Sequence, residues 1–441
     1  MRPWFVLSFA LAACKPSAEC TVDCGGDADT DADSDADTDS DTDADTDSDT
    51  DADTDADNDE ALVRDLIASG GDAEAVLATV AGNTGWPVHT ADDTYLFVYG
   101  DTGDWSLCGD AMGWYPDPCV AMTAGAGFVW AEVTIPSPEG SFYKFRDTSD
   151  YVADPLARSH SYDVFGDVSY VEPPATGWWI DRWPNLGGHT MSAREVNVLV
   201  PGHGGPYPVL YMHDGQNLFE WDPPGFVASG WFVQDAAAAL STPIMVVGID
   251  NTADRFDEYT HTDEVDGSYV FNARGDDYAD YVTLDIKPFI EARYPTSDRA
   301  GVMGSSLGGL ISLWIGHRYP SQYDFVGAMS PSLFIGAVDS AGPTMREAYL
   351  ADPVHPFTIY ADSGGAAGGG GCTDPDGDGT FEDDPDSSDD YCDTRAFVDA
   401  MADHGYVWND NLFHWYASGA EHTEAAWADR LSHPFAIFAQ P

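Results

Sequence analysis

The chain has 441 residues, and 43% of them are hydrophobic, which is enough for a sizeable core and for two domains. It carries 77 acidic residues against 17 basic ones, so its formal net charge at pH 7 is −60. Such a surface repels phosphate backbones and anionic lipids, which excludes DNA, RNA and other polyanions as partners.

The N-terminus predicts export. Arg2 precedes a short apolar run from Trp4 to Ala13, as in a signal peptide. The run ends in Leu-Ala-Ala-Cys, which resembles the lipobox of bacterial lipoproteins, whose cysteine is acylated and becomes the new N-terminus. We therefore expect residues 1–13 to be a lipoprotein signal peptide and Cys14 to carry the lipid. The alternative is a plain cleavable signal followed by an incidental cysteine.

The lipid on Cys14 is the one membrane contact that we expect, because no other stretch reaches the 18 apolar residues of a spanning helix. Lys15 follows the cysteine instead of the aspartate that retains lipoproteins at the inner membrane. By resemblance to other lipoproteins, this predicts a cell-envelope location at the outer membrane or cell surface.

Seven cysteines are present, and lipidation of Cys14 leaves six in three sequence-local pairs. Because exported proteins favour disulfides over free thiols, we predict Cys20–Cys24, Cys108–Cys119 and Cys372–Cys392.

Residues 14–59 form the predicted lipid anchor and a disordered, Asp-rich tether. Every odd position from Asp27 to Asp59 is aspartate, and a segment with one charge in two residues repels itself and buries no core. We interpret it as a spacer between membrane and folded part. Weak collection of calcium is the alternative, although scattered carboxylates lack the fixed geometry of a calcium site.

Residues 60–175 are predicted to be a helical lead-in followed by a small β-sandwich. Glu60 to about Val80 has a helical apolar spacing, and from Thr94 onward the apolar runs are short and separated by Gly, Pro and Asp. The aromatic residues of this region are most simply core or rim, but some could line a ligand face: Trp105, Trp114 and Tyr115.

Residues 176–441 alternate strand and helix. The strands are near-continuous apolar runs, as expected where both faces of a sheet are buried: VNVLVP, PVLYMHD, IMVVGID, AGVMGS, FVGAMSP, FTIYADS and LFHWYAS. We therefore predict an α/β fold with a doubly wound, mostly parallel sheet.

The run GSSLGG places Ser306 between Gly304 and Gly308 in the pattern G-x-S-x-G. The pattern is weak alone, but an apolar strand precedes it and a helical run follows it, as at a nucleophile elbow. A serine on such a sharp turn has a strained backbone and needs small neighbours two positions away. The helix N-terminus adds positive potential beside a developing oxyanion. A structural Gly-rich turn is the alternative.

A serine nucleophile needs a base, and four histidines follow a plausible acid: His404, His414, His422 and His433. His404 ends a predicted helix, His414 lies inside the last strand, and His433 belongs to the terminal segment. His422 lies in the loop after the last strand, at the sheet edge where α/β folds gather their sites. We assign the base to His422.

An oxyanion hole needs the amide after the nucleophile, which is that of Leu307, and a second amide after an earlier strand. The run YMHDGQNLF follows a buried strand directly, so the amides of Gly215 and Gln216 are candidates. A simple turn is the alternative reading.

Five segments occur in an order that resembles a known family: DGQNLF, RFDEY from Arg255, KPFIEARYPTSDR, GSSLGG and AEHTEAAWADRL. They are similar to the esterase family that includes esterase D, feruloyl esterases and enterochelin esterases. The preceding region, with YKFRD and DPLARSHSYD, resembles the immunoglobulin-like domain of enterochelin-esterase-like proteins. The resemblance implies an α/β-hydrolase fold, with Ser306 as nucleophile, His422 as base and Arg255 near the substrate.

The chain departs from this family at the acid. Family members place an Asp or Glu shortly after the strand that reads FTIYADSG here, where this chain has an acidic insert at residues 365–392. A helix bearing Thr394 resumes the pattern, so the acid should lie just before it. We choose Asp389, with Asp390 and Asp362 as rivals; a carboxylate there would orient the imidazole.

The insert also contains Asp374, Asp376 and Asp378, followed by Gly379, which matches the front of a D-x-D-x-D-G calcium loop. The closing glutamate is missing, and a solvated acidic loop is the alternative. The predicted disulfide would lower the cost of ordering such a loop.

Together these features predict a serine carboxylic-ester hydrolase that works through an acyl-enzyme. We expect a small-molecule or polysaccharide-linked ester as substrate, no catalytic cofactor, and calcium as a candidate structural ion. The rival function is a non-catalytic surface protein that binds glycan or calcium on a hydrolase fold.

Overall fold

The structure is a computed structural model that describes residues 51–115, 118–148, 150–163, 165–219, 230–266, 269–337, 342–365, 372–373, 382–383, 389 and 391–440. The predictions for Cys14, for Cys20–Cys24 and for the calcium ligands Asp374, Asp376 and Asp378 lie outside these residues. Among the described residues, no helix is long and apolar enough to cross a membrane.

Two helices open the described chain, α1 (Asp51–Ser69) and α2 (Ala73–Gly82). The expected helix begins earlier than Glu60, inside the segment predicted to be a tether. The middle of α1 is anchored, because the buried carboxylate of Asp59 accepts a hydrogen bond from Asn83 Nδ2 at 2.9 Å. Gly70, at φ +71°, then lets the chain turn between the two helices.

Ten antiparallel strands follow among the described residues and form parts of two sheets. One sheet has the order β1-β2-β6-β5, and α1 and α2 cover its outer face through the cluster that includes Val63, Leu77 and Leu96. Its other face packs against the second sheet, where the rings of Phe97 and Tyr143 meet edge to face at 4.9 Å. The strands are β1 (Val88–Ala91), β2 (Thr94–Tyr99), β3 (Ser106–Gly109), β4 (Val120–Ala121), β5 (Thr123–Ala124), β6 (Val129–Thr134), β7 (Phe142–Arg146), β8 (Tyr151–Val152), β9 (Ser159–Asp163) and β10 (Gly166–Tyr170).

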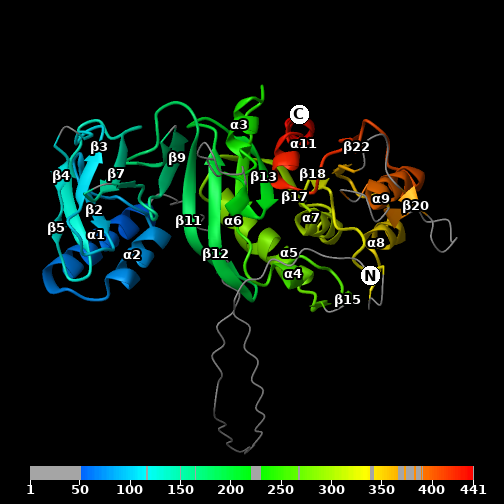
Figure 1. The fold of residues 1–441 in the computed structure, drawn as a ribbon, viewed down its shortest axis with the longest axis horizontal. Coiled ribbons are helices and arrows are strands. Elements are labelled where there is room, and N and C mark those ends of the chain that lie inside the picture. The colour runs from blue at the N-terminus through cyan, green and yellow to red at the C-terminus, as the bar shows by residue number, and fades with distance from the viewer. Residues whose placement is uncertain are drawn as a thin grey trace, which may run out of the picture. The chain divides into compact units, whose positions relative to one another are not determined.

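The expectation of a separate small β-sandwich domain is not confirmed. Strand β9 pairs with β11 (Trp179–Gly188), with His160 opposite Ile180, so the second sheet continues without a break into the strands that follow. Figure 1 shows this continuity from β9 through β11 and β12 (Met191–Val200). A local strand pattern cannot predict this result, because it does not specify which neighbour an edge strand will pair with.

Within the part of the chain that the structure describes, the same sheet has 14 strands and includes the predicted α/β half, in the order β12-β14-β13-β17-β18-β19-β22. From β14 to β22 all neighbours are parallel, as predicted, but β12 is antiparallel to β14 and to β11. The prediction of a mostly parallel sheet is therefore wrong for the sheet as a whole. His189 and Thr190 alone join β11 to β12, both at positive φ, and such a tight hairpin forces antiparallel pairing. The parallel strands are β13 (Tyr207–His213), β14 (Met245–Ile249), β17 (Thr296–Ser305), β18 (Phe325–Met329), β19 (Thr358–Ser363) and β22 (Leu412–Tyr416).

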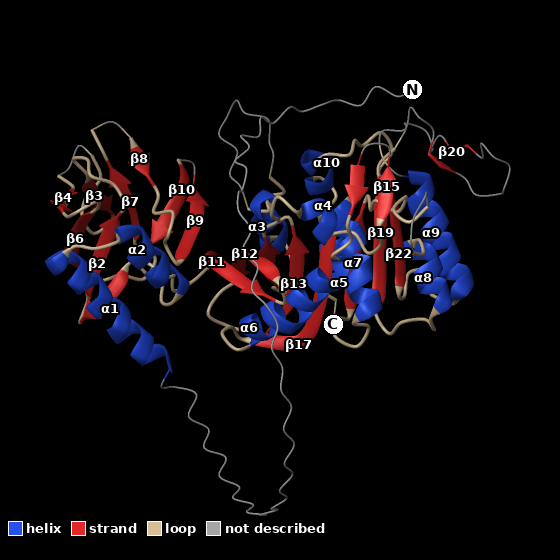
Figure 2. Ribbon diagram, turned by 90° about the horizontal axis from the view of Figure 1, so that it is seen from below, coloured by secondary structure: helices blue, strands red, loops and turns tan. Residues whose placement is uncertain are grey.

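Helices cover both faces of the parallel strands (Figure 2). One face carries α5 (Gly275–Asp280), the π-helical η2 (Tyr281–Ile286), α6 (Lys287–Glu291), α7 (Leu307–Arg318), α8 (Met345–Ala351) and α9 (Tyr391–His404). The other carries α3 (Val233–Ala238), α10 (Glu424–Ala428) and α11 (Ser432–Phe438). Short elements complete the chain: η1 (Gly215–Asn217), α4 (Arg255–Glu258) and the pairs β15 (Glu264–Asp266) with β16 (Tyr269–Phe271) and β20 (Cys372–Thr373) with β21 (Glu382–Asp383). The doubly wound arrangement predicted for this half is confirmed.

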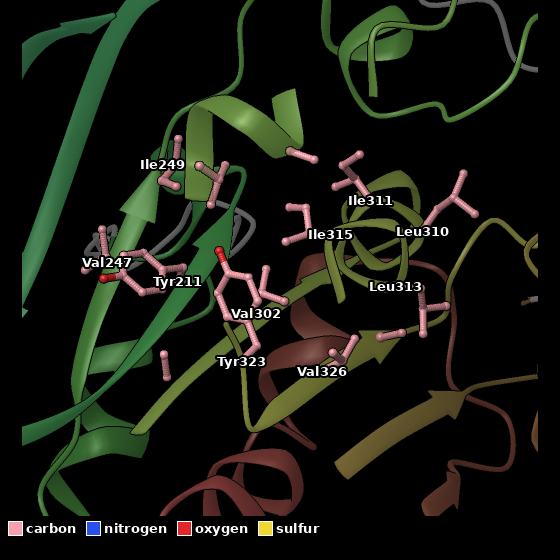
Figure 3. Packing of buried hydrophobic residues seen from close by; sticks show 14 of the residues in the cluster. Tyr211, Val247, Ile249, Val302, Leu310, Ile311, Leu313, Ile315, Tyr323 and Val326 are labelled. Carbon is pink, nitrogen blue, oxygen red and sulfur yellow. The ribbon is translucent and has the colours of Figure 1, made fainter. Parts of the chain in front are cut away.

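Helix α7 is fixed by its packing on the sheet. Figure 3 shows three buried side chains of α7, Leu310, Ile311 and Ile315. Val302 and Val326, on the neighbouring strands, belong to the same hydrophobic cluster. All five are fully buried. Because the helix cannot tilt without opening this core, the turn at its N-terminus is held rigidly.

The structure contains the disulfides Cys108–Cys119 and Cys372–Cys392, as predicted. The first links β3 to the chain just before β4. The second links β20, inside the acidic insert, to the first turn of α9.

Candidate active site

Ser306 occupies a strained turn between β17 and α7. Its backbone lies at φ +57° and ψ −126°, a region that non-glycine residues avoid. A Cβ on Gly304 would lie 2.7 Å from backbone atoms of Gly308, which closes the turn. Position 304 therefore needs a residue without a Cβ, because the Gly308 backbone occupies that space, in agreement with the prediction from the pentapeptide. Ser306 Oγ lies 3.3 Å from Ser332 Oγ.

His422 and Asp389 form a hydrogen-bonded pair, with 2.7 Å between Nδ1 and Oδ1. The other carboxylate oxygen accepts hydrogen bonds from Ser330 Oγ, at 2.5 Å, and from the amide of Gly364. The Asp389 side chain is fully buried, whereas His422 is one-third exposed. This is the arrangement expected for an acid that orients an imidazole.

The pKa of Asp389 is held below its ordinary value. Burial alone would raise the pKa of this carboxyl group, but the hydrogen bond and charge of His422 and the hydrogen bonds from Ser330 and Gly364 outweigh burial. The carboxylate is thus kept ionised at neutral pH. The ring of Trp427 meets that of His422 edge to face, with centroids 5.0 Å apart, and limits its rotation.

The rival acids lie elsewhere. Asp362, in β19, is buried and bonded to Arg430 Nε at 3.0 Å and to the Tyr360 hydroxyl at 2.7 Å. Asp390 lies outside the described residues. Of the three candidates, the structure pairs Asp389 with His422.

The other histidines occupy the positions predicted for them. His404 ends α9, where its Nε2 lies 2.7 Å from the carbonyl oxygen of Asp352. His414 is in β22, with Nδ1 bonded to the carbonyl of Ala361, and His433 stacks on Trp415. Each has its own local contact away from Ser306.

A cavity of about 250 Å³ opens beside the turn. Ser306 and His422 both line it, together with Asp214, Asn217, Trp231, Asn251, Arg255, Ser305, Glu424 and Trp427. The predicted nucleophile and base therefore face one space, at the carboxyl ends of the parallel strands.

The predicted oxyanion donors are on two elements next to this cavity. Leu307 is the first residue of α7, and Gly215 and Gln216 begin the helical turn η1 directly after β13. The first amides of a helix or helical turn have no partner within it, so all three are suited to bind an anion. A Cβ on Gly215 would lie 2.7 Å from backbone atoms of Gly248 and Ile249, so glycine is required there.

Sequence reasoning missed Asp214, which holds Arg255 in the cavity wall. Two hydrogen bonds of 2.6 and 2.8 Å join the Arg255 guanidinium to the Asp214 carboxylate, and Asn251 Nδ2 donates to the same carboxylate at 2.7 Å. Arg255 thus lines the cavity beside Ser306, and its charge is balanced by Asp214. The signal was available, because Asp214 opens the segment DGQNLF.

The model of the family described as Putative esterase matches residues 188–436, which is more than half of the chain. The chain belongs to the Putative esterase family. Ser306, Asp389 and His422 all lie within the matched residues. A curated relative is the uncharacterized protein YbbA of Bacillus subtilis, 28% identical over 158 residues. That alignment covers 34% of this chain, and the chain spans 60% of the length of that relative.

Solved structures similar to this member of the family include the enterobactin esterase FES from Shigella flexneri, at 15% identity and a TM-score of 0.41. The match covers 80% of this chain and 95% of that one. The IroE-like serine hydrolase from Shewanella oneidensis matches at 17% identity and a TM-score of 0.43, over 59% of this chain and 79% of that one. The siderophore hydrolase EstA from Aspergillus nidulans matches at 13% identity and a TM-score of 0.40. That match covers 60% of this chain and 95% of the other.

Proposed function

We propose that this protein is a serine carboxylic-ester hydrolase whose catalytic residues are Ser306, His422 and Asp389. One observation carries the proposal: a strained serine and an imidazole bonded to a buried carboxylate line the same cavity. Membership of the esterase family supports it independently.

In the first half-reaction, Ser306 Oγ attacks the ester carbonyl carbon while His422 takes the hydroxyl proton. Because Nδ1 bonds Asp389, Nε2 is the ring nitrogen that takes it. The tetrahedral intermediate carries its negative charge on the former carbonyl oxygen, which the amides of Leu307 and Gln216 or Gly215 stabilise. The carbon–oxygen bond to the alcohol then breaks, and the imidazolium returns the proton to the departing alkoxide.

In the second half-reaction, a water molecule attacks the acyl-enzyme and gives a proton to His422. The second tetrahedral intermediate expels Ser306, which recovers its proton, and the carboxylic acid product leaves. Asp389 stays ionised throughout and stabilises each imidazolium. We assign Arg255 a part in shaping the acyl or alcohol site, since its pairing with Asp214 makes it a fixed wall and not a free cation.

The test is covalent labelling of the purified protein by a fluorophosphonate, combined with hydrolysis of a panel of acyl esters. We expect stoichiometric labelling of the wild type and none of Ser306→Ala, with ester hydrolysis lost in parallel. Ser332→Ala is the matched control, since Ser332 is a buried neighbour of Ser306 outside the proposed mechanism. A folded wild type that neither labels nor hydrolyses any ester would overturn the proposal.

We also propose attachment to the cell envelope through a lipid on Cys14. Metabolic labelling with a fatty acid should mark the wild type and leave Cys14→Ser unlabelled and released.

For the insert, we propose structural calcium at Asp374, Asp376 and Asp378. Chelation with EDTA should then lower thermal stability or esterase activity, and no change in either would contradict it.

A further inference from the structure

Three side chains with metal-binding groups converge at the C-terminal end of α7, far from the cavity. His317 lies in the last turn of α7, Asp352 follows α8, and His355 lies in the loop that leads to β19. One ligand atom from each lies within 4.8 Å of the others. We propose that His317, Asp352 and His355 bind a divalent transition-metal ion, with zinc as the best match.

The separations fit a shared ion better than hydrogen bonds. His317 Nδ1 lies 3.4 Å from His355 Nε2 and 3.6 Å from Asp352 Oδ2. Both distances exceed the roughly 2.7–3.2 Å of a normal hydrogen bond. Two ligand atoms bound to zinc at about 2.0–2.1 Å and a tetrahedral angle lie about 3.4 Å apart. All three ligand atoms lie within 4.8 Å of one another, so the Asp352 carboxylate has to move inward to complete the set.

The two imidazoles are held in place by aromatic neighbours. The His317 ring packs on Tyr349 with centroids 5.5 Å apart, and the His355 ring stacks on Phe357 at 5.3 Å. The backbone amide of His355 donates to the hydroxyl of Tyr406 at 3.1 Å. A ligand set whose rings are already oriented loses little entropy when the metal binds.

The chemistry of the set selects the ion. Two imidazoles and one carboxylate suit zinc and its transition-metal neighbours, whereas calcium and magnesium prefer oxygen ligands. The Asp352 side chain is half exposed, so water can complete the coordination.

The position argues for a structural ion. His317 lies 11 residues after Ser306, so about 16 Å of rigid helix α7 separates this cluster from Ser306. An ion here would join the end of α7 to α8 and to the segment entering β19. The ion would cross-link these three segments and would take no part in ester chemistry.

The test is zinc binding to the full chain, measured by calorimetry. Excess calcium is added so that it competes with zinc for the carboxylates of the Asp-rich segments. The wild type should bind one zinc ion that Asp352→Asn and His317→Gln bind at least about 100-fold more weakly, as expected when a direct ligand is lost. Cobalt should give the visible absorption of an ion with nitrogen and oxygen ligands in the wild type alone. Zinc should also raise the melting temperature of the wild type and not of the variants.

The matched control is His89→Gln, which removes an exposed imidazole from β1 and should bind zinc as the wild type does. Asp352→Asn changes only an exposed side chain, so it keeps the test valid if His317→Gln fails to fold. Equal zinc affinity in the wild type and in Asp352→Asn would overturn the proposal.

Discussion

Two regions of this protein bury polar side chains, and they use them differently. In the antiparallel region, the buried polar side chains form separate pairs. The Tyr143 hydroxyl donates to Asp154, and the Ser159 hydroxyl donates to Asp181. In the parallel region, polar residues lie at the carboxyl ends of adjacent strands, along one edge of the sheet: Asp214, Ser306, Ser330 and Asp362. Asp214 and Ser306 line the cavity, and Arg430 bonds both Ser330 and Asp362. Parallel strands bring their ends to one edge, whereas antiparallel strands alternate theirs between two edges. The comparison teaches that a buried polar group indicates a site when it converges with others on a cavity.

The largest expected effect is on kcat, and it distinguishes two buried aspartates of the parallel region, Asp389 and Asp362. Asp389→Asn should lower kcat about 10⁴-fold, because the amide cannot orient and stabilise the imidazolium. Asp362→Asn should affect mainly stability, since Asp362 pairs with Arg430 and not with His422. Ester hydrolysis by both variants, with circular dichroism to monitor folding, checks this. A larger loss of kcat in folded Asp362→Asn would reverse the assignment of the acid.

Ser330→Ala should reduce kcat by about 10- to 100-fold, the value of a hydrogen bond to a charged group of about 1.5–3 kcal/mol. We expect Ser330 to act as a positioning residue, because its hydroxyl donates to Asp389 and accepts from Trp427 Nε1 and Arg430 Nη2. Because it acts through the carboxylate, the acid limb of the kcat/KM profile should move while KM stays near its wild-type value. An effect confined to the melting temperature would mean that Ser330 is structural.

Two buried aspartates, Asp154 in the antiparallel region and Asp389 beside the parallel strands, should respond to pH with opposite sign. Burial raises the pKa of Asp154 to about 6, above that of the unfolded chain, so the folded state keeps a proton that the unfolded state has lost. Its contribution is therefore lost as pH rises from about 4 to about 6, by roughly 2–3 kcal/mol. Asp389 has a lowered pKa, so its contribution is present above about pH 4 and lost as pH falls.

Urea unfolding of the wild type and Asp154→Asn between pH 4 and pH 7 measures this difference. The variant should lose less stability than the wild type as pH rises. Parallel curves for the two proteins would contradict the raised pKa of Asp154.

The smallest effect is expected for Tyr143→Phe. The change removes one buried hydrogen bond, of 2.7 Å to Asp154, and should cost about 1–3 kcal/mol of unfolding free energy. Because Tyr143 lies in the antiparallel region, kcat and KM should be unchanged. Differential scanning calorimetry and steady-state kinetics together measure both quantities, and a fall in kcat at full folding would break the contrast between the regions.

Sequence could predict the parts of this protein that depend on local pattern. The buried strands, the glycine-bounded turn at Ser306 and the loop position of His422 all follow from periodicity and residue size. Sheet continuity through β9 and β11 does not, because pairing partners are chosen by tertiary packing. Asp389 could be chosen only among three carboxylates, since a long insert separates it from the strand that normally precedes the acid. The pairing of Arg255 with Asp214 joins residues 41 positions apart, which no spacing rule specifies.

The disulfide Cys372–Cys392 has an evolutionary consequence. Cys392 lies three residues after Asp389, so the cross-link fixes the end of the insert that carries Asp389, whatever the sequence from residue 374 to residue 388. Mutations that lengthen, shorten or recharge that segment are thereby shielded from the Asp389–His422 contact. The insert is free to diversify, which allows a new surface to be selected beside a sheet edge that stays the same.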